Sequence, residues 1–139
     1  MLTLSGVACP TDSYCIAVGR GSSAGASHLA AVTWNGSTWA STATPTPGND
    51  DRTEDTFADV ACSSKTNCVA AGSYETNGPP DTQTLAERWD GQRWTIDSTA
   101  NPNSFPELLD VACSSTGCTA VGSMSGNGFG ATLVEHSSH

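Results

Sequence analysis

The sequence predicts an all-β protein built from repeated units of four antiparallel strands. One unit recurs as LSGVACPTDSYCIAVG, FADVACSSKTNCVAAG and LLDVACSSTGCTAVG, and a second segment recurs as AAVTWNGSTW and LAERWDGQRW. Charged residues make up only 14% of the chain, whereas the Gly, Pro, Asn and Ser residues that form turns are plentiful. Four short strands in a repeat of about 50 residues are typical of β-propeller blades.

The 139 residues form a single repeat domain of about 2.7 units. Repeat 1 spans about residues 2–47, repeat 2 about 55–103, and an incomplete repeat 3 about 106–139. The Pro-rich linkers TPTPGNDDRTED and TANPNSFPE lie between them. Because proline cannot donate to a strand ladder, we expect each linker to carry the chain from one sheet to the next.

The middle repeat is complete and defines the order of the elements. Apolar β-forming segments predict strands at residues 57–62, 68–74, 84–89 and 94–98. The SSKTN loop joins the first two strands, and a turn at 90–93 joins the last two. The third repeat begins its third strand as TLVEHSSH, and no counterpart of the fourth strand follows in the given sequence.

The turn before the last strand carries a hairpin signal. Asn-Gly at 35–36 and Asp-Gly at 90–91 predict type I′ turns, in which both central residues need a positive φ. Two tryptophans flank each turn. They could meet across the hairpin or lie on opposite faces, depending on the register. The tryptophans are Trp34 with Trp39, and Trp89 with Trp94.

Each repeat contains one pair of cysteines, separated by turn-forming residues. Two antiparallel strands joined by a tight loop bring such residues to the separation that a disulfide needs. Closing so short a loop stabilises the fold by about 2 kcal/mol. Zinc is the alternative, but it usually needs closer spacing and His partners. The predicted disulfides are Cys9–Cys15, Cys62–Cys68 and Cys113–Cys118.

Composition restricts the location and the partners. Disulfides indicate an oxidising compartment, so we expect a secreted or cell-surface protein. A net charge of −9 argues against nucleic acid and anionic membranes as partners. No segment approaches the roughly 20 apolar residues that a membrane-inserted helix needs. The first residues, MLTLSGVAC, lack the basic and apolar regions of a signal peptide.

Glycines and tryptophans give the unit a resemblance to known repeats. Gly19, Gly72 and Gly122 end the second predicted strand, and the Trp pairs flank the last hairpin. This arrangement resembles the kelch-type propeller repeat, although kelch units have a double glycine and lack the paired cysteines. The pattern V-x-C…C-x-A-V-G…W-[ND]-G-x-x-W is more similar to a repeat of secreted actinobacterial proteins. That resemblance implies a propeller fold and secretion, but no reaction.

The number of repeats raises a problem of closure. Propellers close with about four to eight blades, so three blades leave bare apolar faces and unpaired strand edges at both ends. Two chains could form a ring of six blades, chains could add head to tail into a filament, or the blades could belong to a longer propeller. A β-trefoil or another three-fold β arrangement is the alternative fold.

Catalytic groups do not recur with the repeat. None of His28, His136 and His139 has a counterpart in the other units, so we expect no enzyme, no cofactor and no metal. The acidic run at 49–55 could bind calcium, but it lacks the EF-hand pattern and a solvated loop is the favoured interpretation. The sequon at 35–37 coincides with the predicted turn.

Tryptophan is the residue type with a credible binding role. Trp34, Trp39, Trp89 and Trp94 could stack on sugars, although packing between blades is the favoured interpretation. We therefore expect a secreted, non-catalytic binding module with glycan as the favoured ligand. The alternative is a structural protein that self-associates through its exposed strand edges.

Overall fold

The structure is a computed structural model, and it describes residues 1–47, 54–76, 82–101, 105–126 and 129–138. Across these ranges the chain forms eleven strands and no helix, which confirms the all-β prediction.

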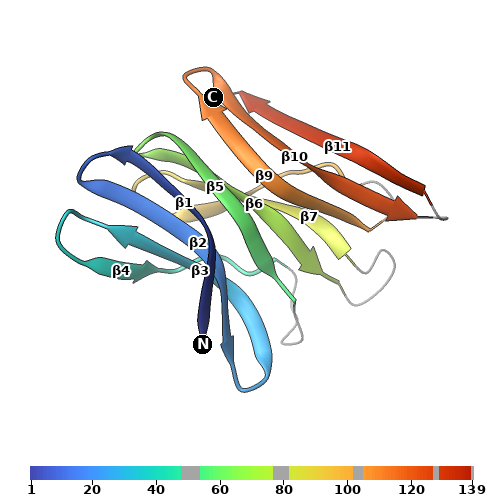
Figure 1. Cartoon of the computed structure of the whole chain (residues 1–139), viewed down its shortest axis with the longest axis horizontal. Helices are drawn as coiled ribbons and strands as arrows, with labels where there is room; N and C mark the ends of the chain where they lie inside the picture. The colour runs from blue at the N-terminus through green and yellow to red at the C-terminus, as the bar shows by residue number, and fades with distance from the viewer. Residues whose placement is uncertain (48–53, 77–81, 102–104, 127–128, 139) are drawn as a thin grey trace.

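The strands form three separate antiparallel sheets, one from each repeat (Figure 1). In the described parts of the chain, no strand of one repeat pairs with a strand of another repeat. Successive repeats therefore form different sheets, as predicted. Sheet 1 contains β1 (Leu2–Thr11), β2 (Tyr14–Ser23), β3 (Ala26–Trp34) and β4 (Trp39–Thr42); sheet 2 contains β5 (Thr56–Ser64), β6 (Asn67–Glu75), β7 (Thr82–Trp89) and β8 (Trp94–Asp97); sheet 3 contains β9 (Pro106–Ser114), β10 (Gly117–Gly126) and β11 (Phe129–Ser138).

The four strands of sheet 2 coincide with those predicted for the middle repeat, within three residues at each end. Sheet 3 has the order β11-β10-β9, so β11 takes the place of the third strand and lies at the edge. The outer edges of β3 and β7, by contrast, pair with the short strands β4 and β8.

The predicted type I′ turns are wrong. Trp34 pairs with Trp39, so four residues form the loop, and only its glycine has a positive φ, 95° at Gly36. The Asn35 side chain stabilises this longer loop, because its Oδ1 accepts the backbone N–H groups of residues 37 and 38, each at 2.9 Å. Asp90 makes the same two bonds in sheet 2, and they lower the pKa of its carboxyl group.

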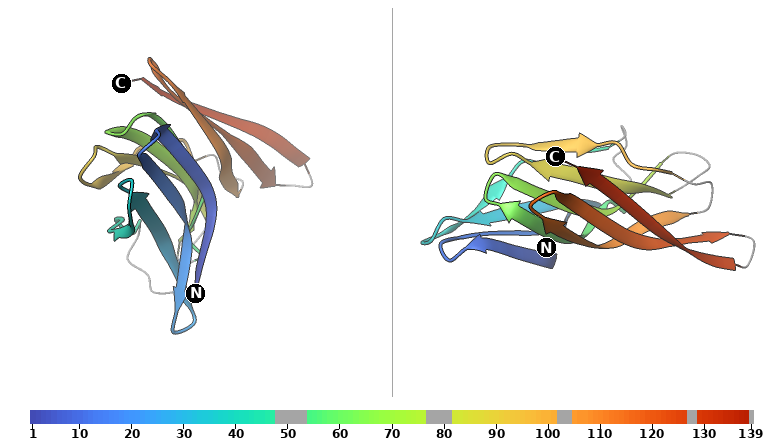
Figure 2. Two further views of the ribbon diagram at one scale, coloured as in Figure 1. Left: turned by 60° about the vertical axis from the view of Figure 1, so that its left-hand side comes forward. Right: turned by 90° about the horizontal axis from the view of Figure 1, so that it is seen from above.

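Each sheet has two faces, which define how the sheets pack. The tryptophan face of sheets 1 and 2 carries their Trp pairs, and in sheet 3 it is the face with Cys118 and Ala120 at the equivalent positions. The reverse face carries Ile16 and Val18 in sheet 1. The reverse face of sheet 1 packs on the tryptophan face of sheet 2, and that of sheet 2 packs on the tryptophan face of sheet 3. Sheet 2 therefore lies between the other two (Figure 2).

Candidate functional site

All six cysteines form the three predicted disulfides, which leaves no cysteine for zinc. The Cα atoms of the pairs lie 4.1, 4.0 and 4.0 Å apart. Cys62 and Cys68 are direct cross-strand partners, as are Cys113 and Cys118. Each disulfide thus links the first two strands of one sheet, and three of them are consistent with an extracellular protein.

The register resolves the question that the sequence left open about the tryptophans. Trp34 lies directly opposite Trp39, and Trp89 lies opposite Trp94, with ring centroids 5.6 Å apart in both pairs. The pairs differ in their surroundings. The pair in sheet 2 is buried, whereas Trp39 in sheet 1 is 51% exposed.

Trp94 is part of the contact between sheets 1 and 2. Its ring stacks on Phe57 at a centroid distance of 5.9 Å. Its indole Nε1 donates a hydrogen bond to Oγ1 of Thr42, on the reverse face of sheet 1, at 3.1 Å. The second Trp pair is therefore a packing element, and no face of Trp94 is open to a ligand.

Equivalent positions of the tryptophan face are buried in sheets 2 and 3 but exposed in sheet 1. Val60 and Val111 are 3% and 6% exposed, whereas Val7 is 62% exposed. Trp94 is 4% exposed, against 51% for Trp39. The large side chains of sheet 1 are thus uncovered where a preceding sheet covers those of sheets 2 and 3.

The reverse face of sheet 3 shows the same contrast. Val18 and Ala71 are fully buried on the reverse faces of sheets 1 and 2, but Val121 at the equivalent position is 42% exposed. Its cross-strand partner Val134 is 64% exposed. We call the tryptophan face of sheet 1 and the reverse face of sheet 3 the two end faces. They are the candidate functional surfaces of this protein.

Glu87 is a buried acid that the sequence analysis missed. It lies on the tryptophan face of sheet 2, it is 0% exposed, and neither carboxyl oxygen has a hydrogen-bond partner among the described residues. Burial, with a smaller contribution from the charge of Asp55, raises its pKa to about 8. Repeat 1 has Val32 at the equivalent position. An acid in place of this valine was the one feature of the sequence that could have pointed to a buried carboxyl group.

Two further carboxyl groups lie together where the first strands of the sheets meet. Asp59 and Asp110 occupy equivalent positions, and both accept the backbone N–H of Val111, at 3.2 and 2.9 Å. Burial and the nearby Asp110 raise the pKa of Asp59. The equivalent residue of sheet 1 is Gly6, where a Cβ would lie 2.7 Å from Oδ1 of Asp59, so only glycine fits there.

The other predicted sites do not form a shared centre. Most of the acidic run at 49–55 lies outside the described residues, and of its last two members Glu54 is exposed and Asp55 is buried. His28 and His136 lie on different sheets, and His139 is not described. Within the described ranges no three His, Cys, Asp or Glu residues are placed to hold a metal ion. Nor does any helix there qualify as a membrane span.

Neither a protein-family model nor a curated protein matches the chain.

Proposed function

We propose that this protein is a secreted, non-catalytic assembly module, made of propeller-type blades that bind equivalent blades through the two end faces. The tryptophan face of sheet 1 would receive the reverse face of sheet 3 of a second copy. The observation that carries the proposal is the exposure of Val7 and Trp39, whose equivalents in sheet 2 are buried by a neighbouring sheet.

The internal interfaces support this pairing. Twice within the chain, a reverse face packs on a tryptophan face, and both contacts bury their large apolar side chains. Burying apolar surface stabilises an association by roughly 25 cal/mol per Å² before the entropic cost of binding. Because the two end faces differ, the contact is heterologous, and repeated contacts give either a ring or a filament.

A mixing experiment tests this proposal. We expect Val7→Glu and Val134→Glu each to abolish self-association, because each places a charge in one end face. Each variant keeps the other end face intact. An equimolar mixture should therefore form a 1:1 dimer, detected by native mass spectrometry or by light scattering after gel filtration.

Gln92→Glu is the matched control, since it also adds one negative charge but lies in the exposed turn between β7 and β8, away from both end faces. It should self-associate like the unaltered protein. An unaltered protein that stays monomeric at high micromolar concentration would contradict the proposal. A mixture that stays monomeric, although the unaltered protein associates, would contradict the head-to-tail pairing.

Carbohydrate binding is the second candidate function, and the exposed Trp pair of sheet 1 favours it. Trp39 presents half of its surface to solvent beside Trp34, and tryptophan rings stack on the apolar faces of sugars. We expect added oligosaccharide to change the tryptophan fluorescence of the Val134→Glu variant, in which no second copy covers the rings. The change should disappear with Trp39→Ala, and a flat titration across a panel of sugars would rule this candidate out.

A further inference from the structure

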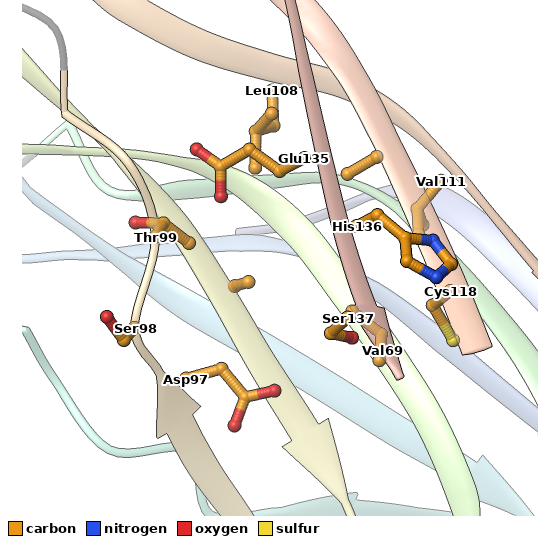
Figure 3. A pocket seen from close by; sticks show the side chains of 12 residues that line it. Val69, Asp97, Ser98, Thr99, Leu108, Val111, Cys118, Glu135, His136 and Ser137 are labelled. Atoms are coloured by element: carbon orange, nitrogen blue, oxygen red, sulfur yellow. The ribbon is translucent and has the colours of Figure 1, made fainter. Parts of the chain in front are cut away.

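A pocket lies between sheets 2 and 3 beside the edge strand β11 (Figure 3). Leu108 and Val111 form part of its apolar lining, and Asp97 of β8 lies opposite Ser137 of β11. Most of the residues that line it belong to the reverse face of sheet 2 and the tryptophan face of sheet 3. Ser98 and Thr99, which follow β8, and His136 of β11 also line it. The pocket is therefore part of the interface between these two sheets.

The equivalent space between sheets 1 and 2 is occupied by indole rings. Trp89 and Trp94 fill it there, with Phe57 stacked on Trp94 and Thr42 accepting its indole N–H. In sheet 3 the equivalent of Trp89 is Ser137, which occupies the same register position opposite the second cysteine.

The other lining residues correspond as well. Leu108 replaces Phe57, and Asp97 replaces Thr42 as the acceptor on the neighbouring sheet. The strand that would carry the equivalent of Trp94 is not among the described strands of sheet 3. The pocket thus has the apolar lining and the polar acceptor of a tryptophan site, without the tryptophan.

We propose that β11 and this pocket form an acceptor site for an extended peptide strand that carries a tryptophan. The peptide would pair antiparallel with the outer edge of β11, as β8 pairs with β7. Its tryptophan, placed opposite Ser137, would enter the pocket. Addition of a strand to a sheet edge uses main-chain hydrogen bonds for affinity and a side-chain pocket for specificity.

Polar groups at the rim favour indole over other aromatic rings. Asp97 is held by Arg88, whose Nε and one terminal nitrogen lie 3.1 and 2.7 Å from Oδ2. A carboxylate has acceptor sites for more than these two bonds, so it can also accept an indole N–H. The guanidinium, which also reaches Ser137 Oγ at 3.4 Å, adds a cation close to the expected ring position.

The test uses a synthetic peptide with the sequence DGQRWTIDS, which is residues 90–98 of this chain and contains β8. The protein is the Val7→Glu variant, whose altered end face lies on sheet 1, so that self-association does not compete. We expect the peptide to bind in a fluorescence-anisotropy titration. Backbone amide signals of β11 should shift in NMR spectra when it does.

Two altered peptides measure the contribution of the tryptophan. Replacing it by alanine should weaken binding about 30-fold, the factor expected for loss of a buried aromatic anchor. Replacing it by phenylalanine should weaken binding about 5-fold, because the ring remains but the N–H donor is lost. A shuffled peptide of the same composition is the control for unspecific binding.

Three results would overturn the inference. They are no binding at millimolar peptide, equal affinity for the tryptophan and alanine peptides, and NMR shifts that lie on sheet 1 instead of on β11. The inference does not depend on the end-face proposal, which the mixing experiment tests separately. A peptide that binds to β11 when the mixing experiment fails would therefore support this site alone.

Discussion

Trp94→Ala should lower the free energy of unfolding by about 3–5 kcal/mol, the usual cost of removing a buried tryptophan. The substitution removes the stacking on Phe57 and the hydrogen bond to Thr42, and it leaves a cavity between sheets 1 and 2. Trp39→Ala makes the same chemical change at the equivalent position of sheet 1. It should cost less than about 1 kcal/mol, because the Trp39 side chain is half exposed in the folded protein.

Chemical denaturation with the disulfides intact measures both values. The Val134→Glu background removes any contribution of self-association to the stability of the Trp39 position. Equal losses for the two substitutions would contradict the placement of the sheets, because the difference between them depends only on which tryptophan face another sheet covers.

Glu87→Gln should stabilise the protein by about 3 kcal/mol at pH 7 and leave its stability unchanged near pH 4. The pKa of Glu87 is about 8 in the folded protein, against an ordinary value of 4.5. Below pH 4.5 the carboxyl group is protonated in both the folded and the unfolded chain, so burial carries no ionic cost. Between pH 4.5 and 8 the unfolded chain loses this proton and the folded chain keeps it, so stability falls as the pH rises.

The size of the effect follows from the shift, since one pKa unit corresponds to about 1.4 kcal/mol. Denaturation curves of the unaltered protein and of the Glu87→Gln variant, measured from about pH 4 to about pH 8.5, should give stabilities that diverge steadily and become parallel above about pH 8. Glu54→Gln, at an exposed position just before this repeat, is the control and should not change this profile. A constant difference between the unaltered protein and the Glu87→Gln variant at every pH would show that the carboxyl group is not buried as described.

Local features of the repeat were predictable because they depend on short stretches of chain. The loop between Cys62 and Cys68 closes a hairpin by itself, so spacing and turn residues sufficed to predict the pair. The four strands of the middle repeat were predictable for the same reason. The error in the turns was also local. The side chain of Asn35 accepts two backbone N–H groups within the loop, and these contacts stabilise a four-residue loop instead of a two-residue type I′ turn.

The environment of each side chain could not be read from the repeat. Trp39 and Trp94 have similar neighbours in sequence, yet one is exposed and the other is buried. Glu87 stands where repeat 1 has Val32, but its altered pKa arises from the sheet packed over it. Both differences depend on residues that are distant in the sequence, which no local pattern describes.

The sequence by itself therefore determined the strands, the number of repeats and the disulfide within each of them. Tertiary structure alone decided which faces are covered. The three repeats have nearly equivalent sequences, but their sheets occupy different positions in the stack. Only the middle sheet has a neighbour on both faces within the described parts of the chain. The sheets on either side of it each keep one apolar face exposed, and burial by a neighbour is what makes the difference between a core residue and a binding surface.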